Sequence, residues 1–571
     1  MGKPRQERPI DQAQSQVPIH EARQTAVPVN DSDANKKKEE LAPTSTGTAT
    51  RNEKHTNVDA DAIVKEEKPS HASGNENELE EKPPHAEIAL TGDSSLDTAS
   101  TDSNLPSSPI NLPTWRKLMI TLSLCLVGFA IGFESSIGSA LVGPIIQIFR
   151  VAHPLGLLNV SIYLKGWSFG TALFGPLSEV YGRQYPLYIG VFLFVTFQIP
   201  TAVAENVETI LICRFLTGFF GSVPLIMVYG IFKDIYHPKK RDLAMNCWVT
   251  SLLTGAALGP IAGSYLVANR ARGWRWVEYT TIILSSAIYL TVFFIPETHI
   301  PRLLQKHPKY TRPGDERDLA RARETDCNRT SAKRLIDIWI NRPFIMLFTD
   351  LVLFLMTLHS ALAMGVLYIS FETFMLPFLQ TRRWLPSKAS LPPYIILFLG
   401  ILCGSLITSY FILSFFRRRR RRPEHRLLPV IIGAFLLSSG LFWFAWTNKR
   451  TLHWLGQAAS CVFIGAGIFL ILQQSEAYVL EIYEAGGYRD SALVATIFLR
   501  SLFAAGFTMA SRPMYERVHV PWATSAWGFI TMACIPIPIV VFLYGEKMRA
   551  KGRYTKASFV EEIGLERNGE A

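Results

Sequence analysis

Residues 175–183 read GPLSEVYGR and form a short charged turn between two apolar runs, at about 159–178 and 185–204. Because a helix needs roughly 20 apolar residues to cross the hydrocarbon core of a bilayer, each run is predicted to be one transmembrane helix. Two glycines permit a tight turn, and the Glu179 carboxylate stands four residues before the Arg183 guanidinium. The stretch therefore predicts a helical hairpin with a charged turn at the membrane surface.

The same alternation of apolar runs and polar turns extends over most of the chain. It predicts an all-α membrane protein of twelve transmembrane helices, arranged as two halves of six. The predicted spans are approximately 117–138, 159–178, 185–204, 209–231, 243–268, 275–296, 347–371, 393–415, 427–446, 452–472, 490–511 and 521–544. The predicted organisation is a disordered N-terminal tail (1–114), an N-terminal half (115–298), a charged central linker (299–342), a C-terminal half (343–544) and a C-terminal tail (545–571).

Composition and charge narrow the class of protein further. No Phe, Trp or Tyr precedes Trp115, so the N-terminal tail cannot bury enough apolar surface to offset the entropy of ordering. The formal net charge is +11, but the basic residues fall in short loops, as in the six arginines at 417–422. That distribution predicts membrane topology, with both termini cytoplasmic, rather than nucleic-acid binding. The seven cysteines are scattered, mostly inside apolar runs, which predicts neither disulfides nor a metal site.

Ionisable residues inside the predicted spans are candidate substrate or proton sites, because charge at membrane depth is costly. Arg214 lies in the fourth span, although a purely structural ion pair is an alternative role for it. Glu134 in the first span and Lys165 in the second are predicted to pair with each other. Glu372 in the seventh span and Glu476 in the tenth are possible proton carriers, unless they face water at the membrane edge.

The fifth span carries a stripe of small residues. Gly255, Gly259 and Gly263 recur every fourth residue and therefore line one face of a helix, while Pro260 can kink it. Such a stripe permits close packing of two helix backbones in a membrane. The spacing alone predicts only a helix contact.

Several of these stretches resemble the major facilitator superfamily. Residues 175–183 resemble its signature loop, which implies a cytoplasmic gating loop formed by Gly175, Glu179, Gly182 and Arg183, with the acid facing the start of the eleventh helix near Asp490. The RFLTG element at 214–218 resembles one that the family links to proton coupling. The Gly255, Gly259, Pro260 and Gly263 pattern resembles the antiporter motif of its drug exporters. Further matches to the fungal twelve-span drug:proton antiporters occur at 273–276, 296–298, 342–344, 368–372, 491–492, 500–503 and 520–525, within about residues 115–550.

The resemblance implies a major facilitator fold with pseudo-symmetric halves and a proton-coupled secondary transporter. It would export small hydrophobic compounds, such as drugs, toxins or a self-made metabolite, by alternating access. The expected partners are the substrate and the lipid bilayer, with a monomer in the plasma membrane, and the expected energy source is the proton gradient without cofactor or metal. No ATP-binding loop, His-rich metal cluster or nucleophile elbow is found in the sequence, so no enzyme is predicted. The alternatives are a polyamine or nutrient carrier on the same fold and a non-transporting membrane sensor.

Overall fold

The computed structural model describes residues 109–269, 273–298, 340–415, 422–556 and 559–560. Almost all of the predicted N-terminal tail and central linker, and the arginine run up to residue 421, lie outside these residues. Within them the chain is helical and contains no β-strand.

The long helices fall into two sets, separated by the undescribed residues 299–339. The first set comprises α2 (Thr114–Ile137), α4 (His153–Tyr181), α5 (Gln184–Val203), α6 (Val207–Gly221), α7 (Val223–Ile235), α8 (Pro238–Ala268) and α9 (Arg275–Val292). The second comprises α14 (Leu351–Thr373), α16 (Pro386–Phe415), α17 (Leu427–Trp446), α19 (Ser460–Ile482), α20 (Arg489–Ala533) and α21 (Pro536–Lys551). The short helices are α3 (Val142–Phe149), α13 (Arg342–Thr349), α15 (Leu376–Gln380), α18 (Trp454–Ala458), η1 (Pro109–Asn111), η2 (Gly138–Leu141) and η5 (Pro423–Arg426).

These helices account for twelve membrane crossings in the described part of the chain. Nine helical segments there are long and apolar enough to cross a membrane by length and composition. One of them, Arg489–Lys551, counts twice because the chain breaks at His519, whose φ of 62° and ψ of 160° are not helical. The long helices α4 and α9 add two more, while α6 and α7 meet at Ser222 and form a single crossing. Six crossings lie on each side of residues 299–339, as the sequence predicts.

Local chemistry sets many of the helix ends. Proline stands in the first turn of α4, α7 and α8, where its missing N–H costs no hydrogen bond. Asn206 caps α6 by accepting from the backbone N–H of Thr209, and Asp350 caps α14 by accepting from Val352. Helix α4 ends at Gly182, whose φ of 79° suits glycine far better than other residues.

The tenth predicted span, 452–472, ends too early. The structure has the short helix α18 followed by α19, which continues to Ile482. The polar residues Gln473, Gln474 and Ser475 interrupt the apolar run in the sequence, yet all three are buried. A hydropathy pattern treats polar residues as a membrane boundary, whereas here they face the interior of the protein.

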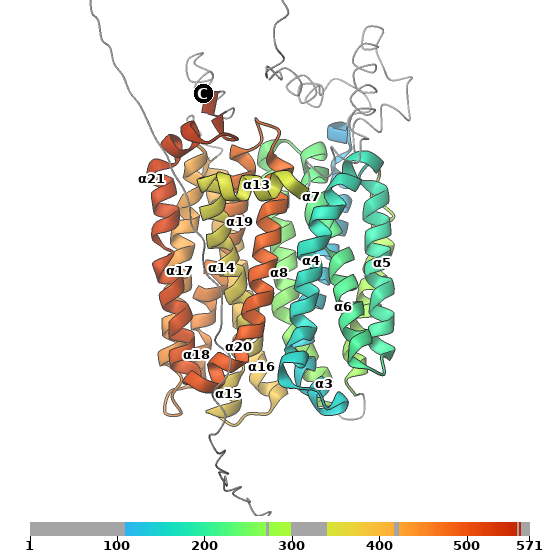
Figure 1. The fold of residues 1–571 in the computed structure, drawn as a ribbon, viewed down its shortest axis with the longest axis vertical. Coiled ribbons are helices and arrows are strands. Elements are labelled where there is room, and N and C mark those ends of the chain that lie inside the picture. Colours follow the sequence, from blue (N-terminus) through green and yellow to red (C-terminus); the bar gives the residue numbers. More distant parts are fainter. Residues whose placement is uncertain (1–108, 270–272, 299–339, 416–421, 557–558, 561–571) are drawn as a thin grey trace, which may run out of the picture. The chain divides into compact units, whose positions relative to one another are not determined.

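Packing joins the two sets of helices along two lines. Helix α2 lies along α8 and α4 along α6 in the first set, while α14 packs on α20 and α19 on both α16 and α17 in the second. Between the sets, α8 contacts α16, and α4 contacts α20. Helices α4 and α20 lie side by side in Figure 1. Helix α13 lies across one end of the bundle, here called the α13 end, and α3, α15 and α18 lie at the other, the α15 end.

Large apolar side chains are exposed on the long helices of both sets, including Phe192, Ile283, Leu406, Phe435 and Leu543. Soluble proteins rarely expose so much apolar surface. Lipid accepts such side chains, and helices satisfy their backbone hydrogen bonds internally, as a bilayer requires.

Candidate functional site

Arg214 lies at the centre of a buried charged triad in the first set of helices. Its Nη1 donates to Oε1 of Glu134 on α2 at 2.6 Å, and its Nη2 donates to Oε1 of Glu278 on α9 at 2.5 Å. All three residues are 1% exposed. Two carboxylates share one guanidinium, so the triad carries one net negative charge when both acids are ionised and none after binding one proton. Such an arrangement can hold or release a proton without creating a large buried charge.

The predicted pair between Lys165 and Glu134 is wrong. Glu134 binds Arg214 instead, and Lys165 is half-buried on α4 with no ion pair among the described residues. The face of α4 that carries Lys165 also carries Ser161 and Ser168, whose hydroxyls donate to backbone carbonyls of α20 at 2.9 and 3.3 Å. This face therefore turns toward the second set of helices, whereas Glu134 points into the first.

The glycine stripe of α8 packs directly against α2. A Cβ added at Gly255 would lie 2.2 Å from the carbonyl oxygen of Phe129, and one at Gly259 would lie 2.1 Å from Oγ of Ser136. At Gly263 it would lie 2.7 Å from the Cβ of Ala140. At Gly255, no side chain larger than hydrogen fits without moving the backbone of α2, the helix that carries Glu134. The predicted close helix contact is present, and it positions one acid of the triad.

One hydrogen bond connects the region of the triad to the second set of helices. The hydroxyl of Tyr368 on α14 donates to Oγ of Ser135 at 2.8 Å, and both side chains are 1% exposed. Ser135 is the neighbour of Glu134 on α2. A shift of α2 after a change of charge at Glu134 would therefore act directly on the contact between the two halves.

The predicted gating loop brings Arg183 to α7. Its Nη1 lies 2.8 Å from Oδ2 of Asp234, and Gly230 leaves the space that this guanidinium occupies. The carboxylate of Glu297 accepts from the backbone N–H groups of Arg183 and Gln184 and so caps the start of α5. Gly175 lies within α4 and Gly182 ends it, while the side chain of Glu179 lies outside the described part of the structure. Its contact with the start of the eleventh helix remains a prediction.

A first ion-pair cluster joins the halves at the α13 end. Arg426, in η5, donates through Nη2 to Oδ2 of Asp242 on α8 at 2.5 Å and through Nε to Glu481 on α19. Asp242 and Arg426 are nearly buried. Because Asp242 belongs to the first half and Arg426 to the second, this contact holds the two halves together.

A second cluster at the same end surrounds Glu484, between α19 and α20. Its Oε1 lies 3.0 Å from Arg489, 3.2 Å from Arg241 and 3.7 Å from Lys233. Burial acts to raise the pKa of Glu484, but the positive charges of Arg489, Arg241 and Lys233 outweigh it and lower the pKa to about 2. Glu484 is therefore ionised at neutral pH and binds both halves.

Two cavities between the halves share Glu476, and we call them together the central pocket. Eight of the ten residues that line one cavity are apolar. They come from α7, α8, α14, α19 and α20 and include Leu225, Trp248, Leu252, Met364, Leu472 and Ile497. The other continues toward Asp242 and Arg426 at the α13 end. Nη1 of Arg500 donates to Oε2 of Glu476 at 2.9 Å, so this apolar cavity contains one ion pair.

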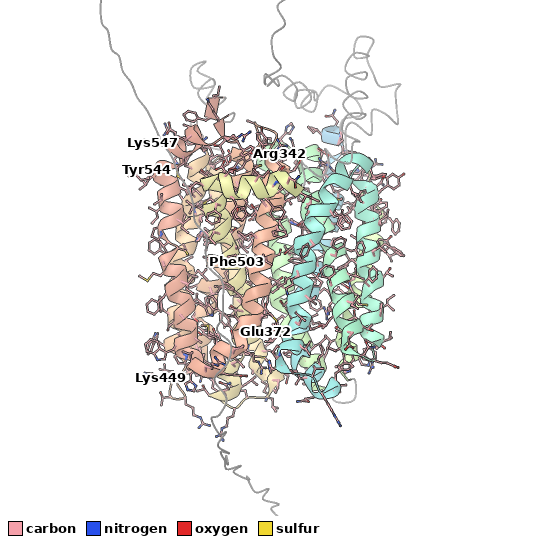
Figure 2. The ribbon with its side chains drawn as sticks, in the orientation of Figure 1. Arg342, Glu372, Lys449, Phe503, Tyr544 and Lys547 are labelled. Carbon is pink, nitrogen blue, oxygen red and sulfur yellow. The ribbon has the colours of Figure 1, made fainter. Side chains whose placement is uncertain are left out.

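Glu372 stands apart from both the triad and the central pocket. It lies near the C-terminus of α14, toward the α15 end, as Figure 2 shows. Its side chain is 4% exposed, and its Oε1 has no hydrogen-bond partner among the described residues.

Of the five predicted coupling candidates, the structure brings together only Arg214 and Glu134. Glu476 lines the pocket, and Lys165 and Glu372 lie elsewhere.

Sequence reasoning missed two residues of these sites, and the sequence contained a signal for each. Glu278 is the only acid in the predicted span 275–296, and Arg500 is the only basic residue in the span 490–511. Lone charges within apolar runs should be treated as candidates. In the described part of the chain, no group of three or more His, Cys, Asp or Glu residues could hold a metal ion.

Comparisons with known proteins agree with this geometry. The family model for the Major Facilitator Superfamily matches residues 124–508. The "Ascochitine biosynthesis cluster MFS transporter" of Didymella fabae is 36% identical over 455 residues, which cover 78% of this chain and 87% of that protein. The "Major facilitator superfamily multidrug transporter FLU1" of Candida albicans is 31% identical over 459 residues, which cover 79% of this chain and 74% of that protein.

Solved structures show the same fold. The proton:xylose symporter XylE, bound to 6-bromo-6-deoxy-D-glucose, matches with a TM-score of 0.54 at 16% identity, over 78% of this chain and 99% of XylE. Together with the two sets of six crossings, these matches confirm the predicted fold. The chain belongs to the major facilitator superfamily and is a multi-pass membrane transporter protein of that family.

Proposed function

We propose that this protein is a proton-coupled exporter of small hydrophobic compounds, including toxins or a metabolite that the cell itself makes. The relatives support export of this kind, since one is named for a biosynthesis cluster and another for multidrug transport. The apolar walls of the central pocket suit a lipophilic molecule. The observation that carries the proton coupling is the triad of two buried carboxylates on one guanidinium.

The coupling follows from charge. When a proton binds Glu134 or Glu278, one carboxylate loses its attraction to Arg214, and the remaining pair is neutral. If Glu134 is the residue freed, it no longer holds α2 against α6; if Glu278 is freed, it no longer holds α9 against α6. Because α2 also carries Ser135, the change reaches Tyr368 and the contact between the halves. Protonation thereby alters the relative stability of two arrangements of the halves, which is the requirement for alternating access.

The ion-pair clusters at the α13 end form the gate that must open in this cycle. Asp242 with Arg426, and Glu484 with Arg241, bind one half to the other there. We assign the α13 end to the cytoplasm, because the basic loops lie at this end. Both termini would then be cytoplasmic in a plasma-membrane protein, and the described arrangement would be closed toward the cytoplasm.

Metabolite profiling followed by vesicle transport tests this function. Untargeted profiling of a strain that lacks the protein should show compounds retained in the cell. Inside-out vesicles carrying the full chain should accumulate those compounds when the lumen is acid, and vesicles carrying the Arg214→Gln variant should not. Movement only out of such vesicles would identify an uptake carrier. Absence of movement under either gradient would favour the non-transporting sensor.

A further inference from the structure

The central pocket contains an ion pair whose two members are not equivalent. Arg500 on α20 and Glu476 on α19 line the apolar cavity, with side chains 10% and 13% exposed. Only one contact, from Nη1 of Arg500 to Oε2 of Glu476, joins them. A guanidinium has five N–H donors. Nε of Arg500 has no hydrogen-bond partner among the described residues, so its donor capacity is not exhausted.

The two charges differ in what happens when a ligand displaces one of them. A ligand cation that bound Glu476 in place of Arg500 would leave Arg500 unpaired among apolar residues. Arg500 would stay charged, since arginine does not lose its proton in proteins. An anion bound to Arg500 would leave Glu476 without its partner, and a carboxyl group, unlike a guanidinium, has a neutral form in proteins. Displacement by an anion is therefore the less costly exchange.

The other charged groups that line the central pocket do not change this comparison. Asp242 and Arg426 are bound to each other at 2.5 Å and lie toward the α13 end. The remaining wall around Arg500 is apolar, from Leu225 on α7 through Trp248 on α8 to Met364 on α14. A ligand that fits this cavity presents a hydrophobic body to the wall and one acidic group to the guanidinium.

We infer that the central pocket recognises lipophilic organic acids, and that Arg500 is the specificity-determining residue for the acidic group. That group is a carboxylate or an ionised phenol or enol on an aromatic or aliphatic scaffold. The planar guanidinium can donate two parallel hydrogen bonds to such a group. This inference rests on the proposed export function, because it names the chemical class of the exported compound.

Equilibrium binding to the purified full chain in lipid nanodiscs tests the inference with three probes of one scaffold. They are anthracene-9-carboxylate, its methyl ester and the 9-(aminomethyl)anthracene cation, followed by fluorescence anisotropy. The acid should bind about tenfold or more tightly than the ester, as expected for a charge-assisted hydrogen bond. Tighter binding of the cation than of the acid, or binding of none of the probes, would overturn the inference.

Variants separate recognition from structural support. Arg500→Gln should remove the preference for the acid while leaving binding of the ester unchanged. Glu476→Gln should keep the preference or increase it, because it frees the guanidinium. The double variant, Arg500→Gln with Glu476→Gln, should behave like Arg500→Gln while leaving no lone charge in the pocket. Arg517→Gln, an exposed arginine on the same helix, is the matched control and should bind like the wild type. Equal weakening of all three probes by Arg500→Gln and by Glu476→Gln would assign the pair a structural role and end the inference.

The same preparation distinguishes this inference from the export function. Acid-selective binding without proton-driven transport would refute export and leave acid recognition standing. Proton-driven transport of the ester, without preference for the acid, would leave export standing and refute acid recognition.

Discussion

Tyr368 donates a hydrogen bond to Ser135 at 2.8 Å, across the boundary between the two six-helix halves and one residue from the buried acid Glu134. The bond joins α14 to the helix that carries part of the charged triad. It therefore links the helix that carries Glu134 and Ser135 directly to the other half.

Removal of this hydroxyl should impair transport more than folding. For Tyr368→Phe we expect a loss of stability near 1 kcal/mol, the usual net value of one hydrogen bond, and a clear reduction in proton-driven transport. Thermal unfolding of the purified protein and transport in inside-out vesicles measure the two effects. Tyr515→Phe is the matched control, since its hydroxyl contacts Thr524 within one half, at 3.1 Å. Equal transport losses in both variants would argue against a role for the contact between the halves.

Loss of Arg214 should destabilise the first half strongly. Arg214→Gln leaves Glu134 and Glu278 buried without a counter-charge, and breaking a buried ion pair in this way typically costs about 3–5 kcal/mol. The triple variant that also carries Glu134→Gln and Glu278→Gln should recover much of the stability but not the proton-driven transport. Melting temperature and vesicle transport provide the two measurements. Lys165→Met, which removes a charge that lacks an ion pair in the described structure, should change stability by no more than about 0.5 kcal/mol.

The glycine stripe allows a test of close packing. At Gly255 a Cβ would lie 2.2 Å from a backbone carbonyl of α2, so Gly255→Ala must displace one helix, at a cost of about 1–3 kcal/mol. At Gly506, in α20, a Cβ would meet nothing within 4 Å. Gly506→Ala should therefore be neutral or slightly stabilising, because alanine favours a helix more than glycine does. If both variants melted at the same temperature, the packing of α8 on α2 would be looser than the structure indicates.

The Glu484 cluster should make stability depend on acid pH. The pKa of this carboxyl is about 2 in the folded protein, below its ordinary value of 4.5. A depressed pKa in the folded state stabilises the protein above the unfolded pKa, and the contribution is lost as pH falls from about 4.5 toward 2. The melting temperature of the wild type should fall through this range more steeply than that of Glu484→Gln. Parallel curves for the two proteins would show that Glu484 contributes no such stability.

Much of the fold follows from local features of the sequence. The length of each apolar run predicts a crossing, and the turn at 175–183 and the stripe at 255–263 predict a hairpin and a close helix contact, all of which the structure contains. The exceptions are instructive, since Gln473 and Gln474 look like a boundary and are instead buried residues inside α19. Hydropathy measures the preference of a residue for lipid or water. A polar residue that faces the protein interior contacts neither, so hydropathy does not predict its position.

The chain alone determined which residues lie at membrane depth, where the charges within that depth are, and where glycine permits contact. Only the tertiary structure decided that Arg214 binds Glu134 and Glu278, and that Lys165 does not bind Glu134. It also decided that Arg500 forms an ion pair with Glu476 in the central pocket. The reason is geometric. Depth depends on the local run of residues along one helix, whereas a partner depends on how each helix is rotated and on which helices from distant parts of the chain pack beside it.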